Sequence, residues 1–226
     1  MSIGSGAPGD PLAAKLRGFG PVGILAMMVI IALGPIIEPL GAVLALAWAR
    51  LSRTPWRNIG FVRPRSWPGT LALGVVLGCI FKFLMKAIVM PMLGAPPINP
   101  AFHYLAGNQA ALPGMFFDVI VGAGFGEETV FRGFLFERLG KLWGHGAPAK
   151  LAIVLLSSAW FGLIHYPVQG LAGAEQAMVV GLVFGTIFAT TGRIWMLIFA
   201  HAAFDVTAVL IIYCDLEPWV AHIVFR

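Results

Sequence analysis

Charged residues are scarce in this sequence: they make up 11% of its 226 residues, against about 25% in an ordinary soluble domain. Hydrophobic residues make up 59%, and the mean hydropathy is +0.88. A soluble fold of this length could not bury so much apolar surface. Disordered, coiled-coil and collagen-like chains are excluded because apolar runs of membrane-spanning length recur along the chain. The composition therefore predicts a membrane protein.

Cysteine is also rare, and several well-known hydrolase motifs are absent. The two cysteines, Cys79 and Cys214, lie in or beside apolar runs, so we expect small core residues and no disulfide framework. The sequence contains no GxSxG, no HExxH and no pair of aspartates placed as in aspartic proteases. A serine mechanism and an ordinary zinc mechanism therefore lack their sequence parts.

The apolar runs are continuous rather than alternating, which favours transmembrane helices over transmembrane strands. The sequence predicts an all-α fold, a polytopic transmembrane helix bundle of about six to eight helices. The expected spans lie near 67–90, 112–137, 150–166, 176–192 and 194–214, preceded by an apolar stretch over 19–49.

The stretch over 19–49 allows two interpretations. It is long for one crossing and short for two, because a crossing needs about 20 residues. We favour one long broken helix. That helix would place Lys15 and Arg17 outside, against the usual charge distribution, so a short hairpin with a cytoplasmic N-terminus stays open.

The positive charges alternate between the breaks and predict an orientation. Five arginines lie between 50 and 67 and three further cations between 138 and 150, whereas 91–112 and 166–176 carry no Lys or Arg. By the positive-inside rule the basic breaks are cytoplasmic and the C-terminus is external, in what we expect to be a bacterial inner membrane. The net charge of +5 then reflects topology, and the lipid bilayer, not nucleic acid, is the expected partner.

One domain accounts for the whole chain. We expect a flexible N-terminal tail over 1–18, a single transmembrane helical domain over 19–214 with a catalytic core at about 111–209, and a short external tail over 215–226. No internal repeat is visible, which disfavours a transporter.

Two adjacent carboxylates and an arginine interrupt an apolar run in GEETVFRGFLFERL, from Gly126 to Leu139. Ionisable groups inside a membrane span are costly and are functional candidates by default. Glu128 and Arg132 are four residues apart and share a helix face, whereas Glu127 points about a third of a turn away. We expect Arg132 to pair with Glu128, which makes Glu127 the candidate general base. A purely structural Glu–Arg pair is the alternative.

Two further polar pairs occur in other apolar spans. Phe161 and His165 are four residues apart in WFGLIHY, and His201 and Asp205 are four apart in FAHAAFD. Each buried polar group needs a partner, and one shared cavity containing water would satisfy all of them. The sequence thus predicts an intramembrane polar cavity at the centre of the bundle.

The depth of His165 conflicts with this grouping. Counting 1.5 Å per residue from the expected span ends places Glu127 and His201 at similar depths toward the cytoplasm, and His165 nearer the external end. Either the boundary of that helix is wrong by two turns, or His165 lies outside the site.

These residues resemble the three signature motifs of the CPBP family, the CAAX prenyl proteases and bacteriocin-processing enzymes also called the Abi family. The motifs are Glu-Glu-x-x-x-Arg, Phe-x-x-x-His and His-x-x-x-Asp, in that order, over about 111–209. WRNIGF at 56–61 is similar to a cytoplasmic motif upstream in that family.

The resemblance implies an intramembrane glutamic endopeptidase with an all-α core. Glu127 would activate a water for attack on a peptide carbonyl, with assistance from His165. Glu128 and Arg132, together with Phe161 of the second motif, would support the site.

The last motif would stabilise the oxyanion through His201 and the residue four later. Asp205 stands where the best-studied members have Asn. An amide always offers a donor, whereas a carboxyl group donates only when protonated. Asp205 is therefore either a protonated donor or a group that orients His201 through a ring nitrogen.

The expected substrate is a peptide or protein in or at the membrane, and no cofactor is expected. The same carboxylates and imidazoles could instead bind a divalent metal such as zinc. We rank the metal-free reaction higher, chiefly because of the family resemblance. A further alternative is a non-catalytic membrane immunity or assembly factor that retains the fold.

Overall fold

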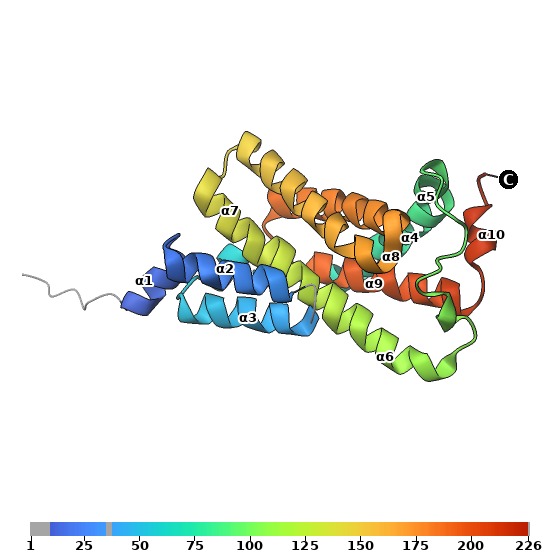
Figure 1. Ribbon diagram of the computed structural model, residues 1–226, viewed down its shortest axis with the longest axis horizontal. Helices are drawn as coiled ribbons and strands as arrows, with labels where there is room; N and C mark the ends of the chain where they lie inside the picture. The colour runs from blue at the N-terminus through green and yellow to red at the C-terminus, as the bar shows by residue number, and fades with distance from the viewer. Residues whose placement is uncertain (1–9, 35–37, 226) are drawn as a thin grey trace, which may run out of the picture.

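The computed structural model describes residues 10–34 and 38–225. Every regular element in these two ranges is helical, which confirms the all-α prediction (Figure 1). The elements are α1 (Pro11–Arg17), α2 (Pro21–Leu33), α3 (Glu38–Leu51), η1 (Trp56–Ile59), α4 (Trp67–Leu84), η2 (Met85–Val89), α5 (Met90–Met92), η3 (His103–Leu105), η4 (Gln109–Ala111), α6 (Leu112–Phe117), η5 (Asp118–Leu135), α7 (Phe136–Trp143), α8 (Ala147–Thr191), α9 (Trp195–Tyr213) and α10 (Glu217–Ala221).

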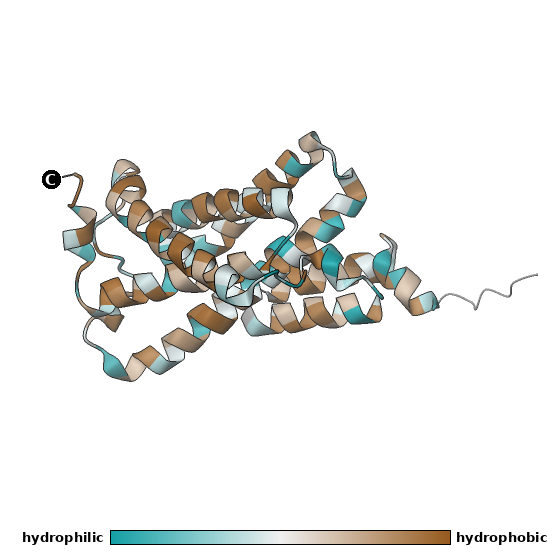
Figure 2. Ribbon diagram, turned by 180° about the vertical axis from the view of Figure 1, so that it is seen from behind, coloured by the Kyte–Doolittle hydropathy of each residue, from teal (hydrophilic) through white to brown (hydrophobic). Residues whose placement is uncertain are grey.

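Among the residues that the structure describes, four helical segments are long and apolar enough to cross a bilayer, or five if α1 and α2, bent by 59°, form one span. Hydrophobic residues dominate these segments in Figure 2, and large apolar side chains such as Leu73, Val76 and Ile80 of α4 are exposed along them. An apolar outer face of this extent is stable against lipid but not against water. The chain is an integral membrane protein. The spans are Trp67–Met92, Gln109–Trp143, Ala147–Thr191 and Trp195–Tyr213.

The longest segment, α8, turns back on itself at Gly170, whose φ of 65° and ψ of −165° are non-helical. Gly181 lies against Ser158, and Gly185 against Val154. Contacts between these positions require 147–169 and 171–191 to run antiparallel. Each half has about the 20 residues of one crossing. The expected spans at 150–166 and 176–192 are therefore the two arms of one helical hairpin.

The N-terminal apolar stretch forms two short helices, α2 and α3, that pack side by side (Figure 1). The single long broken helix that the sequence favoured is wrong, and the hairpin alternative is the one observed. The pairing buries Ile30 and Ala45 in the main core, which a straight helix could not do. The three residues that join α2 to α3 lie outside the described ranges.

Residues 11–17, expected in a flexible tail, form α1 instead, while 1–9 lie outside the described ranges. The Asp10 side chain caps α1 by accepting from the N–H groups of Leu12 and Ala13. Tertiary contacts complete its anchoring: Arg138 of α7 donates to the carbonyl oxygens of Arg17 and Gly18. Local composition cannot predict such contacts, because the residues are far apart in the sequence. They place α1 beside α7, at the end of the molecule opposite α5 and α10 (Figure 1).

The C-terminal residues also differ from the expected tail. Glu217–Ala221 form α10, and Glu217 is only 2% exposed. Lys86 donates to the Glu217 carboxylate at 2.8 Å, and the Asn99 N–H donates to the same oxygen at 3.0 Å. This polar cluster fastens the loop after α5 to the C-terminus and closes one end of the bundle.

Candidate active site

Three helical segments bring the predicted catalytic residues together. Glu127 of η5 lies between two imidazoles: its Oε1 is 3.8 Å from His165 Nε2 of α8, and its Oε2 is 3.6 Å from His201 Nε2 of α9. Glu127 is 8% exposed and His201 is 4% exposed. His165 therefore lies in the cluster, and the alternative that placed it outside is wrong.

The second glutamate forms the predicted pair with arginine. Arg132 Nη1 is 3.0 Å from Glu128 Oε1, and both side chains are almost fully buried. The same Glu128 oxygen accepts a hydrogen bond from His201 Nδ1 at 2.8 Å. A carboxylate only accepts, so the proton of this bond is on Nδ1. Glu128 thus fixes the orientation of the His201 ring, a contact that sequence spacing could not reveal because 73 residues separate the two.

The tautomer of His165 follows from its backbone contact. His165 Nδ1 lies 2.7 Å from the carbonyl oxygen of Phe161. Because a carbonyl oxygen accepts, Nδ1 carries the proton and donates. In the neutral ring Nε2 is then an acceptor, and it is the atom that faces Glu127. His165 can therefore receive a hydrogen bond from a group held beside the Glu127 carboxylate.

Asp205 lies one helical turn after His201 on α9. Its Oδ2 is 3.5 Å from His201 Nε2, the nitrogen that also faces Glu127. The Nδ1 side of the ring is occupied by Glu128. Asp205 can therefore orient the His201 ring only through Nε2.

Phe161 packs the cluster together. Its ring centroid is 4.6 Å from that of His165 and 6.1 Å from that of His201. The guanidinium of Arg132 lies 5.0 Å from the same ring, within the range of a cation–π interaction. The aromatic ring thus supports three of the polar side chains at once and keeps them apart from lipid.

The η5 segment that carries both glutamates is wound as a π-helix over Asp118–Leu135. Its hydrogen bonds run from i to i+5, a rare winding that is found mostly at functional sites.

Two glycines allow close helix packing beside His201. A Cβ on Gly124 of η5 would lie 2.8 Å from Ala202 Cβ, and one on Gly78 of α4 would collide with the carbonyl oxygen of Ala200.

The motif WRNIGF, to which the sequence assigned no role, positions the start of α9. Gly60 adopts a left-handed conformation with φ of 83°, which glycine adopts without steric cost. Its carbonyl oxygen accepts a hydrogen bond from the N–H of Ile194, and the ring of Phe61 packs edge-on against Trp195 at 5.3 Å. The motif thereby fixes the helix that carries His201.

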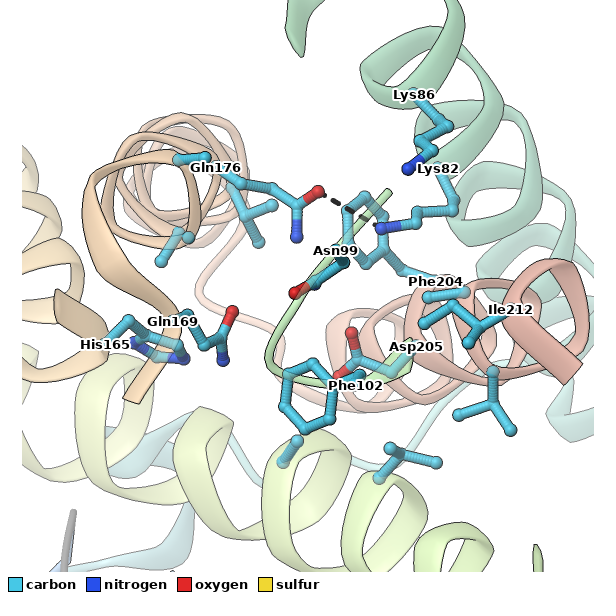
Figure 3. A pocket seen from close by; sticks show the side chains of 18 of the residues that line it. Lys82, Lys86, Asn99, Phe102, His165, Gln169, Gln176, Phe204, Asp205 and Ile212 are labelled. Atoms are coloured by element: carbon cyan, nitrogen blue, oxygen red, sulfur yellow. Dashed lines mark hydrogen bonds between the residues drawn. The ribbon is translucent and has the colours of Figure 1, made fainter. Parts of the chain in front are cut away.

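A cavity of about 530 Å³ extends from the Glu127 cluster to the polar contacts of Lys86 and Glu217 near α5 and α10. Glu127, His165, His201 and Asp205 line one part of it, and Asp118 also contributes. Figure 3 shows its interior, with His165 and Asp205 on different helices facing the same space. The predicted intramembrane polar cavity is therefore present.

Sequence reasoning missed the two lysines of this cavity. From the sequence alone, Lys82 and Lys86 share a helix face, and their side chains are long enough to extend toward the membrane surface. Both instead line the cavity (Figure 3), and Lys82 is only 6% exposed. Their i, i+4 spacing on an apolar helix was the available signal, because two cations on one face in a membrane span need an internal polar partner.

The side chains present do not form an evident metal site. Within residues 10–34 and 38–225, no three His, Cys, Asp or Glu side chains are grouped closely enough to hold a metal ion.

Comparison with known proteins agrees with the motifs. Residues 109–207 match the family described as type II CAAX prenyl endopeptidase Rce1-like, and this segment contains Glu127, His165, His201 and Asp205. No curated protein and no solved structure matches the chain. Residues 109–207 are therefore similar to the type II CAAX prenyl endopeptidases of the Rce1-like family.

Proposed function

We propose that this protein is an intramembrane endopeptidase of the glutamic type, which hydrolyses a peptide bond of a membrane-associated or exported protein or peptide. The observation that carries the proposal is the position of Glu127 between His165 Nε2 and His201 Nε2, at 3.8 and 3.6 Å. These separations exceed a direct hydrogen bond and suit a bridging molecule. A water placed there would donate one hydrogen to Glu127 and the other to His165 Nε2.

The reaction then proceeds by general base catalysis. Glu127 accepts a proton from the water while the water oxygen attacks the carbonyl carbon of the scissile bond. The resulting oxyanion accepts from His201 Nε2, which donates when the ring is doubly protonated. The tetrahedral intermediate collapses as Glu127 returns the proton to the leaving nitrogen, the C–N bond breaks, and a carboxylic acid and an amine are released.

We assign to Asp205 the role of a second oxyanion donor in its protonated form. Its position one turn from His201 supports this assignment, since both side chains then reach the same oxygen. The contact between Glu128 and His201 Nδ1 supports it as well, because the ring already has an orienting carboxylate. Glu128 and Arg132 act as positioning residues.

The orientation in the membrane follows from the charges. Arg138 and Lys15 lie at the end of the molecule that contains α1 and the turn between α7 and α8. The positive-inside rule places that end, α1 included, in the cytoplasm, and this removes the conflict that a single long helix would create. In a bacterial inner membrane α5, α10 and the C-terminus would then be external.

The test compares peptide termini in the membrane and exported proteome of cells that carry the wild type or Glu127→Gln at equal abundance. Glutamine keeps the shape of glutamate but cannot take the proton, so a defined set of termini should disappear. Glu175→Gln is the matched control, because Glu175 belongs to α8 but does not line the cavity. Termini that are unchanged in Glu127→Gln would refute hydrolysis and favour a non-catalytic immunity or assembly role.

A chelator arm separates the metal-dependent alternative. If the wild-type termini persist in the presence of a membrane-permeant chelator, the metal-free reaction is supported. If they disappear with chelator and return with added zinc, the glutamate acts together with a metal ion, and the mechanism described above is wrong.

A further inference from the structure

The cavity contains a second polar group that the proposed reaction does not use. Lys82 of α4 and Gln176 of α8 line the same cavity as Glu127 and Asp205, and Figure 3 shows both side chains directed into it. Neither belongs to the three sequence motifs. A substrate that reaches Glu127 through this cavity could therefore also contact Lys82.

Asp205 and Glu217 attract Lys82 electrostatically, but within residues 10–34 and 38–225 no carboxylate forms a direct ion pair with it. Its Nζ donates one hydrogen bond, to Gln176 Oε1 at 3.1 Å, and lies 4.8 Å above the ring of Phe204. Both partners are uncharged, and no ion pair joins Lys82 to a carboxylate, Asp205 included, within the residues that the structure describes. An ammonium group has three donors, so Lys82 retains donor capacity toward the cavity.

Lys86, one turn further along, provides the contrast. Its Nζ contacts the carbonyl oxygen of Pro97 at 2.6 Å and the carboxylate of Glu217 at 2.8 Å. The charge of Lys86 is therefore neutralised by the protein itself. Of the two lysines on this helix face, Lys86 is directly paired with a carboxylate of the protein and Lys82 is not, among the described residues.

The orientation of Gln176 adds a second donor at the same place. An ammonium group cannot accept a hydrogen bond, so the amide oxygen of Gln176 must face Lys82 and its NH₂ group must point elsewhere. Figure 3 shows the Gln176 nitrogen directed into the cavity, away from Lys82. Lys82 and Gln176 together direct N–H donors into the cavity, and an anionic oxygen accepts strong hydrogen bonds from such donors.

We propose that Lys82 and Gln176 form a subsite that binds a carboxylate of the peptide substrate. The proposal rests on the proposed function, since it requires a peptide in the cavity. The carboxylate would form the direct ion pair that Lys82 does not have with Asp205 or Glu217, which stabilises the buried ammonium group when substrate is bound. Its source is the C-terminus of the peptide or an acidic side chain near the scissile bond.

The test measures binding of peptide libraries to the full-length protein in lipid nanodiscs, by affinity selection and mass spectrometry. Three N-acetylated hexapeptide libraries are compared: one with a free C-terminal carboxyl and no Asp or Glu, one amidated with no Asp or Glu, and one amidated with a single Asp or Glu. We expect at least one carboxylate-bearing library to bind about tenfold more tightly than the uncharged one, as a buried charge-assisted hydrogen bond allows. The better library identifies the source of the carboxylate.

Lys82→Met should remove this preference, and Lys82→Arg should keep it, because methionine retains the length without the charge. Gln176→Glu provides a second variant if Lys82→Met fails to fold, since the new carboxylate would pair with Lys82 and occupy it. The proposal is overturned if the three libraries bind the wild type equally, if none binds, or if the preference persists in Lys82→Met or Gln176→Glu.

The readout separates this proposal from the proposed function. The readout is bound peptide and not cleavage product, so a preference for carboxylates that depends on Lys82 stands even if Glu127→Gln leaves cellular termini unchanged. Conversely, loss of termini in Glu127→Gln together with equal binding of all libraries would support hydrolysis and refute the carboxylate subsite alone.

Discussion

Replacing Arg132 tests whether the Glu128–Arg132–His201 contacts hold the site together. In Arg132→Met the side chain keeps its approximate length and its packing against Phe161 but loses its charge. Glu128 is fully buried; its Oε1 forms an ion pair with Arg132 Nη1 at 3.0 Å and accepts a hydrogen bond from His201 Nδ1 at 2.8 Å. Of these two partners, the Glu128 carboxylate keeps only His201 after the substitution.

The expected cost is large because a charge is left in a buried position. Removal of one partner from a buried ion pair destabilises a protein by about 3–5 kcal/mol. For a chain of this length 1 kcal/mol corresponds to about 2–4 °C in Tm, so the lower figure predicts a loss of about 6–12 °C. The loss of the cation–π contact with Phe161, at 5.0 Å, acts in the same direction.

The double variant Glu128→Gln/Arg132→Met identifies the cause. The introduced glutamine can still accept from His201 Nδ1, and no uncompensated charge remains, so we expect more than half of the lost Tm to be recovered. Thermal unfolding of the purified chain in nanodiscs measures both variants. A loss below about 2 °C in Arg132→Met, or a double variant less stable than the single one, would refute the assignment of Arg132 as counter-ion of Glu128.

Two further predictions concern α9. Asp205→Asn should retain hydrolysis within about tenfold, because an amide donates from the same position in every protonation state, whereas Asp205→Leu should lose about a hundredfold. Initial rates on a peptide from the terminus comparison measure both, and equal loss in the two variants would contradict a donor role. Gly78→Ala should lower membrane abundance, because its Cβ would collide with the carbonyl oxygen of Ala200, whereas Gly114→Ala, with open space around it, should not; equal abundance would contradict close α4–α9 packing.

The sequence predicted contacts that depend on spacing along one helix. Glu128 with Arg132 and His201 with Asp205 are both four residues apart, and both pairs are within 3.5 Å in the structure. Such pairs follow from helical geometry alone, whatever the neighbouring helices do. The spans from 67 onward could be predicted for a related reason, since the length and apolarity needed for a crossing are local properties.

Contacts between helices could not be predicted in this way. The hydrogen bond from His201 to Glu128 joins residues 73 apart, and the one from Lys82 to Gln176 joins residues 94 apart. The sequence carries no register between such segments, so it left the orientation of His201 open and treated Lys82 as a surface cation. For the same reason the sequence offered the α2–α3 hairpin only as an alternative and did not predict α1, because burial of Ile30 and the contacts of Arg138 stabilise them.

The conflict over His165 shows where depth counting fails. The count assumed that every helix begins at one membrane surface and rises along the bilayer normal by 1.5 Å per residue. The first arm of α8 continues beyond the expected end at 166 to Gly170, which places His165 more than one turn before the fold-back. The segment with Glu127 is 35 residues long, so it exceeds a perpendicular crossing and runs obliquely across the bundle (Figure 1). Residues with different counted depths therefore meet, and only contact between the helices, not distance along them, decides which side chains share the cavity.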